Sequence, residues 1–378
     1  MSNPAEEFNL KMSGPDHELT AVWSRPFGGT NERSTTIEVD PLRLRTIDVL
    51  VGLLRRNRLL EDNELKLLGE HLFVTLFQTS KGTDNGPGAL LRQAIKGKRE
   101  PDESGERMLR VSLEFDSDNE KFASWPWEYL FVPPVPGDPD SNFFLSWSTK
   151  LVLTRRMSLN TTSRDMHYQP PLKVLLAVLS PHGHGLVPVV YEPVMKMFID
   201  LRDSEPTPRF RLWVFSPGHA QDGTPYPPDT DDPERTSYPA FADVVSRFNP
   251  HLIHIIGHGR YIQRGDQGAY GQLAFPKDHT EPQWVNDWEI ATELMENDDL
   301  RLVFFQACET AATSSHPYQA ISGMAHSLAQ KNIPAVIGMH FQVKSAMANK
   351  FARDFYQPLM QQKPIEVAMH AGRRALRL

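Results

Sequence analysis

One thiol and one imidazole stand out among the residues able to do chemistry. Cys308 is the single cysteine of the 378-residue chain and lies in the run 306–310, QACET. His258 comes 50 residues earlier (308 − 258), between two glycines, in the run 255–259, IIGHG. A cysteine becomes an effective nucleophile when a neighbouring imidazole takes its proton. The pair therefore predicts attack of a thiolate on a peptide carbonyl, although a buried and inert cysteine is the simpler alternative for Cys308 alone.

Both residues follow short apolar runs that read as buried strands. Residues 251–256 precede His258, and residues 302–305 precede Cys308. From residue 172 onward such runs alternate with helical stretches, which predicts a parallel sheet covered by helices on both faces. Functional loops of these sheets lie at the carboxyl ends of the strands. His258 and Cys308 are therefore expected to meet at one edge of the sheet.

The neighbours of the pair suggest supporting roles. The backbone N–H groups of Gly259 and Cys308 are placed to donate to the oxyanion that develops on an attacked carbonyl. The glycines on either side of His258 would let a substrate backbone approach closely. Gln306 shares a strand face with Cys308, which predicts either a substrate contact or a solvent-facing side chain. His254 reads as a packed strand histidine.

The composition sets limits on the class of protein. With 40% hydrophobic residues the chain is able to bury a sizeable core, and its net charge of −7 gives no reason to expect binding to nucleic acid. No nucleotide-binding glycine loop or metal-ligand spacing occurs, so we expect no cofactor and no metal. No signal peptide and no apolar run of about 20 residues is evident. These features, with the single cysteine, predict a cytoplasmic protein with no membrane partner.

The chain divides into three parts by pattern. Residues 1–40 are polar and predict a flexible N-terminal tail. Residues 41–165 combine two leucine-rich helices with a strand at 108–116, where apolar and polar residues alternate, and predict a small α+β half. Residues 170–378 carry the alternating strands and helices of the catalytic domain.

Several motifs together resemble the CHAT family, a branch of the caspase-like cysteine peptidases that includes separase-type relatives. The resemblance covers about residues 45–378 and rests on the order and spacing of these segments: 113–116, 125–130 (WPWEYL), 153–156 (LTRR), 171–175, 255–259, 306–310, 332–339 and 351–356. It implies a caspase-like αβα sandwich with a mostly parallel central sheet, preceded by a smaller α+β, pseudo-caspase-like half.

The resemblance also implies a function. By position, His258 matches the family's histidine and Cys308 its nucleophile, so it implies a cysteine endopeptidase that cleaves a protein substrate without a cofactor. Family members often act in bacterial defence or programmed death and are switched on by a protein partner. This chain lacks the TPR repeats from which the family takes part of its name, and Glu309 stands where caspases carry Arg. Carboxylates such as Asp266 and Glu309 would favour a basic residue in the substrate.

Two further hypotheses remain open from the sequence. The first is a catalytically silent CHAT-like module that binds partner proteins, against which the intact His258 and Cys308 count. The second concerns residues 216–238, a long segment rich in Pro and Asp. Loops of that length are usually functional or disordered, so the segment is a candidate gate or processing site.

Overall fold

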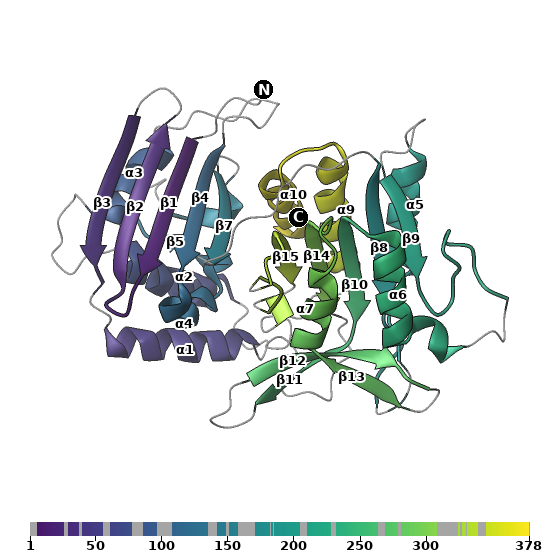
Figure 1. Ribbon diagram of the computed structural model, residues 1–378. Helices are drawn as coiled ribbons and strands as arrows, with labels where there is room; N and C mark the ends of the chain where they lie inside the picture. Colours follow the sequence, from purple (N-terminus) through teal and green to yellow (C-terminus); the bar gives the residue numbers. More distant parts are fainter. Residues whose placement is uncertain are drawn as a thin grey trace. The chain divides into compact units, whose positions relative to one another are not determined.

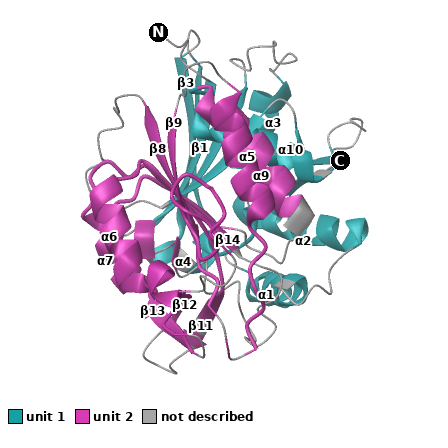
Figure 2. Ribbon diagram, turned by 90° about the vertical axis from the view of Figure 1, so that its right-hand side faces the viewer, with its two compact units in different colours: residues 1–160, 362–378 teal, residues 161–361 magenta. Residues whose placement is uncertain are grey.

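A computed structural model of the chain divides it into two compact units (Figures 1 and 2). Unit 1 comprises residues 1–160 and 362–378, and unit 2 comprises residues 161–361. The last 17 residues (378 − 361) therefore lie with unit 1, whereas the sequence pattern assigned them to a domain spanning 170–378. The structure describes residues 6–25, 29–37, 40–55, 61–77, 86–96, 108–134, 142–148, 151–157, 171–181, 183, 185–204, 210–227, 232–263, 269–278, 281–307, 324–325, 327–329, 331–338 and 345–377.

Unit 2 is built on a sheet whose strands are all parallel, in the order β15-β14-β10-β8-β9. The strands are β8 (Leu172–Val178), β9 (Phe210–Phe215), β10 (Leu252–Gly257), β14 (Leu302–Ala307) and β15 (Ala335–Gly338). The strand that precedes His258, β10, lies between β8 and β14. The expected α/β architecture with a parallel central sheet is therefore confirmed.

Helices cover both faces of this sheet, because residues along each strand alternate between the faces. On one face Ile253, Ile255 and Phe305 pack in a core cluster with residues of α6 (Tyr238–Phe248) and α7 (Asp287–Met295). On the other face, rings of α5 (Glu192–Asp203) and α9 (Ser345–Met360) contact His254 and Phe304. The sheet is thus the central layer of a sandwich.

A second, antiparallel sheet follows His258 directly. It comprises β11 (Gly259–Gln263), β12 (Ala269–Pro276) and β13 (Pro282–Asn286), in that order, with β11 at one edge. The sequence pattern did not predict these strands. Aromatic and polar contacts hold the three strands together: Arg260 lies 4.0 Å from the centroid of the Trp284 ring and donates to Gln272.

The candidate gate at 216–238 contains regular structure where it is described. A tight turn at 218–226 is closed by hydrogen bonds from Ala220 N to Thr224 O and from Tyr226 N to Gly218 O. A 3-10 turn at Pro233–Thr236 then leads into α6, and Ser237 caps that helix. Residues 228–231 lie outside the described residues. The roles of gate or processing site stay predictions.

Unit 1 contains a mixed sheet in the order β3-β2-β1-β4-β7. Its strands are β1 (Glu6–Ser13), β2 (Glu18–Arg25), β3 (Gly29–Thr36), β4 (Leu109–Phe115) and β7 (Leu151–Met157). The expectation of a flexible tail over residues 1–40 is therefore wrong. Phe8, Leu10 and Met12 alternate with polar residues and are buried, so β1 forms the centre of the sheet, antiparallel to β2 and parallel to β4.

Helices and short hairpin strands complete unit 1. The two predicted leucine-rich helices are present, and α3 lies close to the predicted 89–97. The elements are α1 (Pro41–Arg55), α2 (Asp62–Phe77), α3 (Pro87–Lys96), α4 (Glu120–Ala123), β5 (Phe131–Val132), β6 (Phe143–Phe144) and the C-terminal α10 (Ile365–Arg377).

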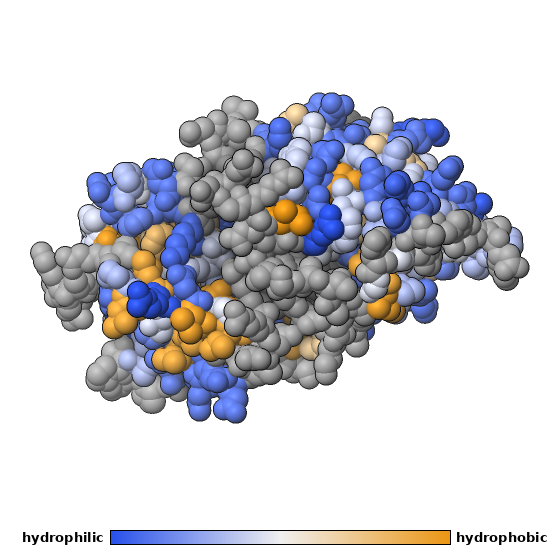
Figure 3. Space-filling view, turned by 90° about the horizontal axis from the view of Figure 1, so that it is seen from below, coloured by the Kyte–Doolittle hydropathy of each residue, from blue (hydrophilic) through white to orange (hydrophobic). Residues whose placement is uncertain are grey.

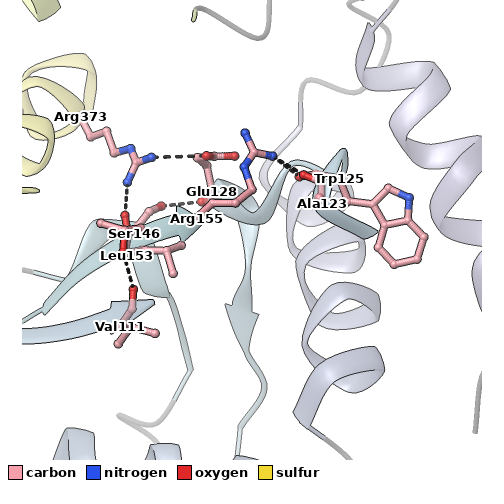
Figure 4. A network of polar contacts seen from close by, with 9 residues as sticks. Val111, Ala123, Trp125, Glu128, Ser146, Leu153, Arg155 and Arg373 are labelled. Atoms are coloured by element: carbon pink, nitrogen blue, oxygen red, sulfur yellow. Dashed lines mark hydrogen bonds and ion pairs between the residues drawn. The ribbon is translucent and has the colours of Figure 1, made fainter. Parts of the chain in front are cut away.

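Polar contacts bind α10 into unit 1 (Figure 4). Arg373 donates to the carbonyl of Leu153 at 2.8 Å and approaches Glu128 Oε1 at 3.3 Å. Arg155 donates to the carbonyls of Ala123 and Trp125. Glu128 and Arg155 belong to the WPWEYL and LTRR motifs. These motifs therefore connect elements of unit 1: Arg155 binds the two carbonyls, and Glu128 pairs with Arg373 of α10.

One face of α1 carries apolar side chains that its own unit does not bury. Leu42 is 71% exposed and Val49 is 57% exposed. They are seven residues apart, which places them on the same side of the helix two turns apart. Figure 3, which views the molecule from below, shows hydrophobic residues gathered on this side of unit 1. No helix among the described residues has the length and apolar character needed to cross a membrane.

The central position of β1 predicts a large effect from a single truncation near the N-terminus. Phe8→Ala removes a fully buried ring and should lower the free energy of unfolding by about 3–5 kcal/mol. Lys11→Ala is the matched control on the same strand, because its half-exposed side chain makes only a surface ion pair with Glu114, worth about 1 kcal/mol or less. Urea denaturation followed by circular dichroism measures both. Equal stability of Phe8→Ala and the unsubstituted chain would contradict the assignment of β1.

Candidate active site

Strands β10 and β14 end side by side. In their parallel register Ile256 is opposite Gln306 and Gly257 is opposite Ala307. His258 is the next residue after β10, and its position at the carboxyl edge of the sheet is as the sequence pattern predicted. Cys308, Glu309 and Asp266 lie outside the described residues.

His258 is held by a backbone carbonyl. Its side chain is buried, and Nε2 lies 2.8 Å from the carbonyl oxygen of Val187. A carbonyl oxygen only accepts, so Nε2 carries the proton in this contact. Burial lowers the pKa of His258 below its usual value, and the Val187 carbonyl partly opposes this shift. The imidazole is therefore neutral at pH 7.

The other ring nitrogen keeps its lone pair in this tautomer. Nδ1 of His258 is buried and has no hydrogen-bond partner among the described residues. In a neutral imidazole protonated on Nε2, Nδ1 keeps its lone pair. A buried polar atom without a partner is costly, and such atoms in native structures call for an explanation. A general base that takes a proton from a nearby group is one explanation that fits this geometry.

Gly257 and Gly259 serve different purposes. A Cβ on Gly257 would lie 3.0 Å from Cβ and 3.2 Å from the carbonyl oxygen of Leu179, so this glycine allows close packing of two strand ends rather than the substrate approach inferred from the sequence. Gly259 is opposite Leu273, and Ala274 N donates to His258 O. That pattern makes Gly259–Leu273 a non-hydrogen-bonded pair. The Gly259 N–H therefore points away from β12.

The side chain of Gln306 points into the domain and contacts His254. It is 3% exposed, and its Oε1 lies 3.1 Å from Nε2 of His254. The solvent-facing alternative for Gln306 is therefore wrong, and the internal contact occupies the atom that a substrate would otherwise meet. Nδ1 of His254 lies 2.8 Å from the hydroxyl of Tyr356, and the His254 ring stacks on Phe304. The prediction of a packed strand histidine at His254 is confirmed.

Both nitrogens of His254 have hydrogen-bond partners, and the two contacts together require the neutral form of the ring. The amide oxygen of Gln306 only accepts, so Nε2 donates to it and Nδ1 accepts from the Tyr356 hydroxyl. Full burial lowers the pKa of His254 to about 3, slightly opposed by the contact with Gln306. His254 and His258 are four residues apart, and of these two it is His258 whose ring keeps a nitrogen without a partner among the described residues.

The family model of the CHAT domain matches residues 232–378. The match includes His258 and Cys308 and confirms the resemblance to this caspase-like, peptidase-type family over that part of the chain. The Saccharomyces cerevisiae separase–securin complex contains a chain that is 12% identical with a TM-score of 0.41; the alignment covers 99% of this chain and 29% of that chain. No curated protein matches the sequence.

Val187 is the site residue that sequence reasoning missed. Its contribution is a main-chain carbonyl, which every residue type supplies, and it lies 71 residues before the histidine it binds. No side-chain signal in the sequence distinguishes Val187 from its neighbours.

The low pKa of His254 predicts a pH-dependent stability. In the folded chain His254 stays unprotonated, whereas in the unfolded chain it binds a proton below about pH 6.5. The contribution of the neutral ring to the free energy of unfolding is therefore fully present above pH 6.5 and is lost as the pH falls toward 3. Between pH 4 and 6 the free energy of unfolding should fall less steeply with falling pH in His254→Gln than in the unsubstituted chain. The two slopes should differ by up to about 1.4 kcal/mol per pH unit. Tyr356→Phe, which keeps the imidazole, should retain the steep dependence. Equal slopes in both variants, measured by urea denaturation, would contradict the assignment.

Proposed function

We propose that the chain is a cysteine endopeptidase in which Cys308 is the nucleophile and His258 the base. The observation that carries the proposal is the state of His258: neutral, fixed through Nε2 by the Val187 carbonyl, with a buried lone pair on Nδ1. Cys308 is bonded to Ala307, which is opposite Gly257 in the sheet.

The reaction follows from these groups. Nδ1 of His258 takes the proton of the Cys308 thiol, and the thiolate attacks the carbonyl carbon of the scissile bond. The imidazolium then gives its proton to the departing amine as the C–N bond breaks, which leaves a thioester. Water, deprotonated by the same Nδ1, attacks the thioester and releases the carboxylic acid and the thiol. Throughout, the Val187 carbonyl stabilises the charged imidazolium by accepting from Nε2.

Two backbone donors complete the proposal. The N–H of Gly259 is turned away from β12 by the antiparallel register and is available to the oxyanion. We assign the second donor to the N–H of Cys308 itself. Donors that are already oriented stabilise developing charge without reorganisation, and each is worth roughly 3 kcal/mol in the transition state.

The preferred substrate residue at the cleavage site is inferred from the charge of two carboxylates. We propose that Asp266 and Glu309 favour a basic side chain, since Glu309 is adjacent to the nucleophile in the chain. Gln306 contributes indirectly, because its Oε1 is occupied by His254. Its role in this proposal is to support β14 from the sheet interior.

Regulation is part of the proposal because His258 is only 1% exposed. A peptide reaches Nδ1 only after part of the surrounding chain moves, which makes a protein activator the expected trigger. The CHAT resemblance suggests a regulated bacterial defence or programmed-death pathway as the setting. The same burial favours a second candidate function, a silent module that binds a partner protein and has no peptidase activity.

Covalent labelling separates the two functions. Peptide acyloxymethyl ketones that differ in the terminal residue should label the purified protein at Cys308, with basic peptides reacting fastest. Cys308→Ala should abolish labelling, and His258→Ala should slow it by about a hundredfold or more. His17→Ala is the matched control, because His17 belongs to unit 1, where its Nδ1 lies 2.7 Å from Oδ1 of Asn119. Mass spectrometry of the labelled peptide gives the readout.

The contradicting outcomes are specific. Cleavage or labelling that persists in Cys308→Ala would exclude the proposed nucleophile. Cysteine labelling that is unaffected in His258→Ala would exclude the proposed base. An absence of labelling both in the isolated chain and with candidate activator proteins would favour the silent module.

A further inference from the structure

The carbonyl that holds His258 belongs to a segment that leaves the neighbouring strand. Pairing between β8 and β10 continues one residue past β8, where Leu179 N donates to Ile256 O at 2.8 Å. The next residue, Ser180, is buried. From there the chain runs through Val187 toward α5. The position of the Val187 carbonyl therefore depends on what fixes this segment at its two ends.

A serine hydroxyl joins the two ends. Ser180 Oγ accepts a hydrogen bond from Val189 N at 3.1 Å, and both residues are buried. Val189 is only two residues after Val187. Downstream, Tyr191 is buried and its hydroxyl lies 2.9 Å from Nδ1 of His219, which anchors the chain again. Val187 itself is 45% exposed, so burial of its own side chain does little to hold it.

We propose that Ser180 is a positioning residue for His258. Its hydroxyl closes the segment 180–189 at Val189 and so fixes the Val187 carbonyl against Nε2 of His258. Since that contact selects the tautomer with the lone pair on Nδ1, Ser180 acts on the base through two hydrogen bonds and a short piece of backbone. The catalytic consequence rests on the function proposed above, whereas the control of the tautomer does not.

Loss of the hydroxyl has a defined consequence. Without Ser180 Oγ the N–H of Val189 is buried without its acceptor, and the segment moves to satisfy it. The Val187 carbonyl then no longer selects Nε2 as the protonated nitrogen. Part of the population carries the proton on Nδ1, where it is unable to accept one from a thiol. A shift of this kind lowers the rate by about ten- to a hundredfold without touching the nucleophile.

Nitrogen NMR of the full chain with 15N-labelled histidine measures the tautomer directly. In the unsubstituted chain, His258, assigned by comparison with His258→Ala, should show one protonated nitrogen, Nε2, and one unprotonated nitrogen, Nδ1. In Ser180→Ala the two resonances should move toward each other, because both tautomers are populated. The pKa of His258 should also fall further, since the Val187 contact favours the charged ring.

Three variants make the test specific. Ser180→Thr keeps the hydroxyl and should keep the tautomer of the unsubstituted chain. Ser180→Gly replaces Ser180→Ala if the latter does not fold, as judged by thermal unfolding. Ser237→Ala is the matched control, because Ser237 Oγ also accepts from a backbone N–H, that of Ala240, at the start of α6. An unchanged tautomer and pKa of His258 in a folded Ser180→Ala or Ser180→Gly chain would overturn the proposal.

Labelling of Cys308 by the best acyloxymethyl ketone peptide tests the catalytic consequence separately. The rate should fall about tenfold or more in Ser180→Ala, return in Ser180→Thr and stay unchanged in Ser237→Ala. A changed tautomer with an unchanged labelling rate would overturn the catalytic part of the inference. If the unsubstituted chain is inert, the peptidase proposal fails, and the NMR result still decides whether Ser180 positions His258.

Discussion

The hydrogen bond from His258 Nε2 to the Val187 carbonyl is the contact on which the site depends. It joins the end of β10 to the segment that leaves β8, and it decides which ring nitrogen carries the proton. The fold makes this bond possible because β8 and β10 are adjacent parallel strands whose carboxyl ends reach the same edge. Gly257 brings the two strand ends close, since any side chain there would collide with Leu179. The sheet thus supplies the position of the imidazole, and one carbonyl supplies its chemical state.

Two histidines, one within β10 and one directly after it, show how burial and hydrogen-bond partners give similar side chains different protonation chemistry. His254 lies between Tyr356 and Gln306, and both nitrogens are satisfied in the sheet interior. Its neutral ring contributes to packing, and its low pKa follows from complete burial. His258 is buried to a similar degree, yet it has one partner and one open nitrogen among the described residues. The difference lies in the number of acceptors and donors placed around each ring, which is why one nitrogen of His258 stays without a partner among the described residues.

Unit 1 is completed by segments from both ends of the chain. Residues 6–13 form its central strand, and α10 is bound through Arg373 to Leu153 and Glu128. The motifs around Glu128 and Arg155, which carry part of the CHAT resemblance, have structural partners in this unit: the carbonyls of Ala123 and Trp125 and the guanidinium of Arg373. Their physical role is therefore to bind elements of unit 1 to one another, whereas His258 and the Val187 carbonyl lie in unit 2.

The sequence by itself determined the parallel strands of unit 2 and the location of His258 at the end of one of them. Apolar runs alternating with helical stretches specify a parallel sheet, because only buried strands tolerate apolar residues on both faces. The same reasoning missed β1, where polar residues on the outer face hid the alternation of Phe8, Leu10 and Met12. Only the tertiary structure decided the role of Val187, the purpose of Gly257 and the internal contact of Gln306. Local patterns encode which segments are strands and which faces are buried. A backbone carbonyl 71 residues away from its partner carries no side-chain signature, so its role exists only once the fold has brought the two together.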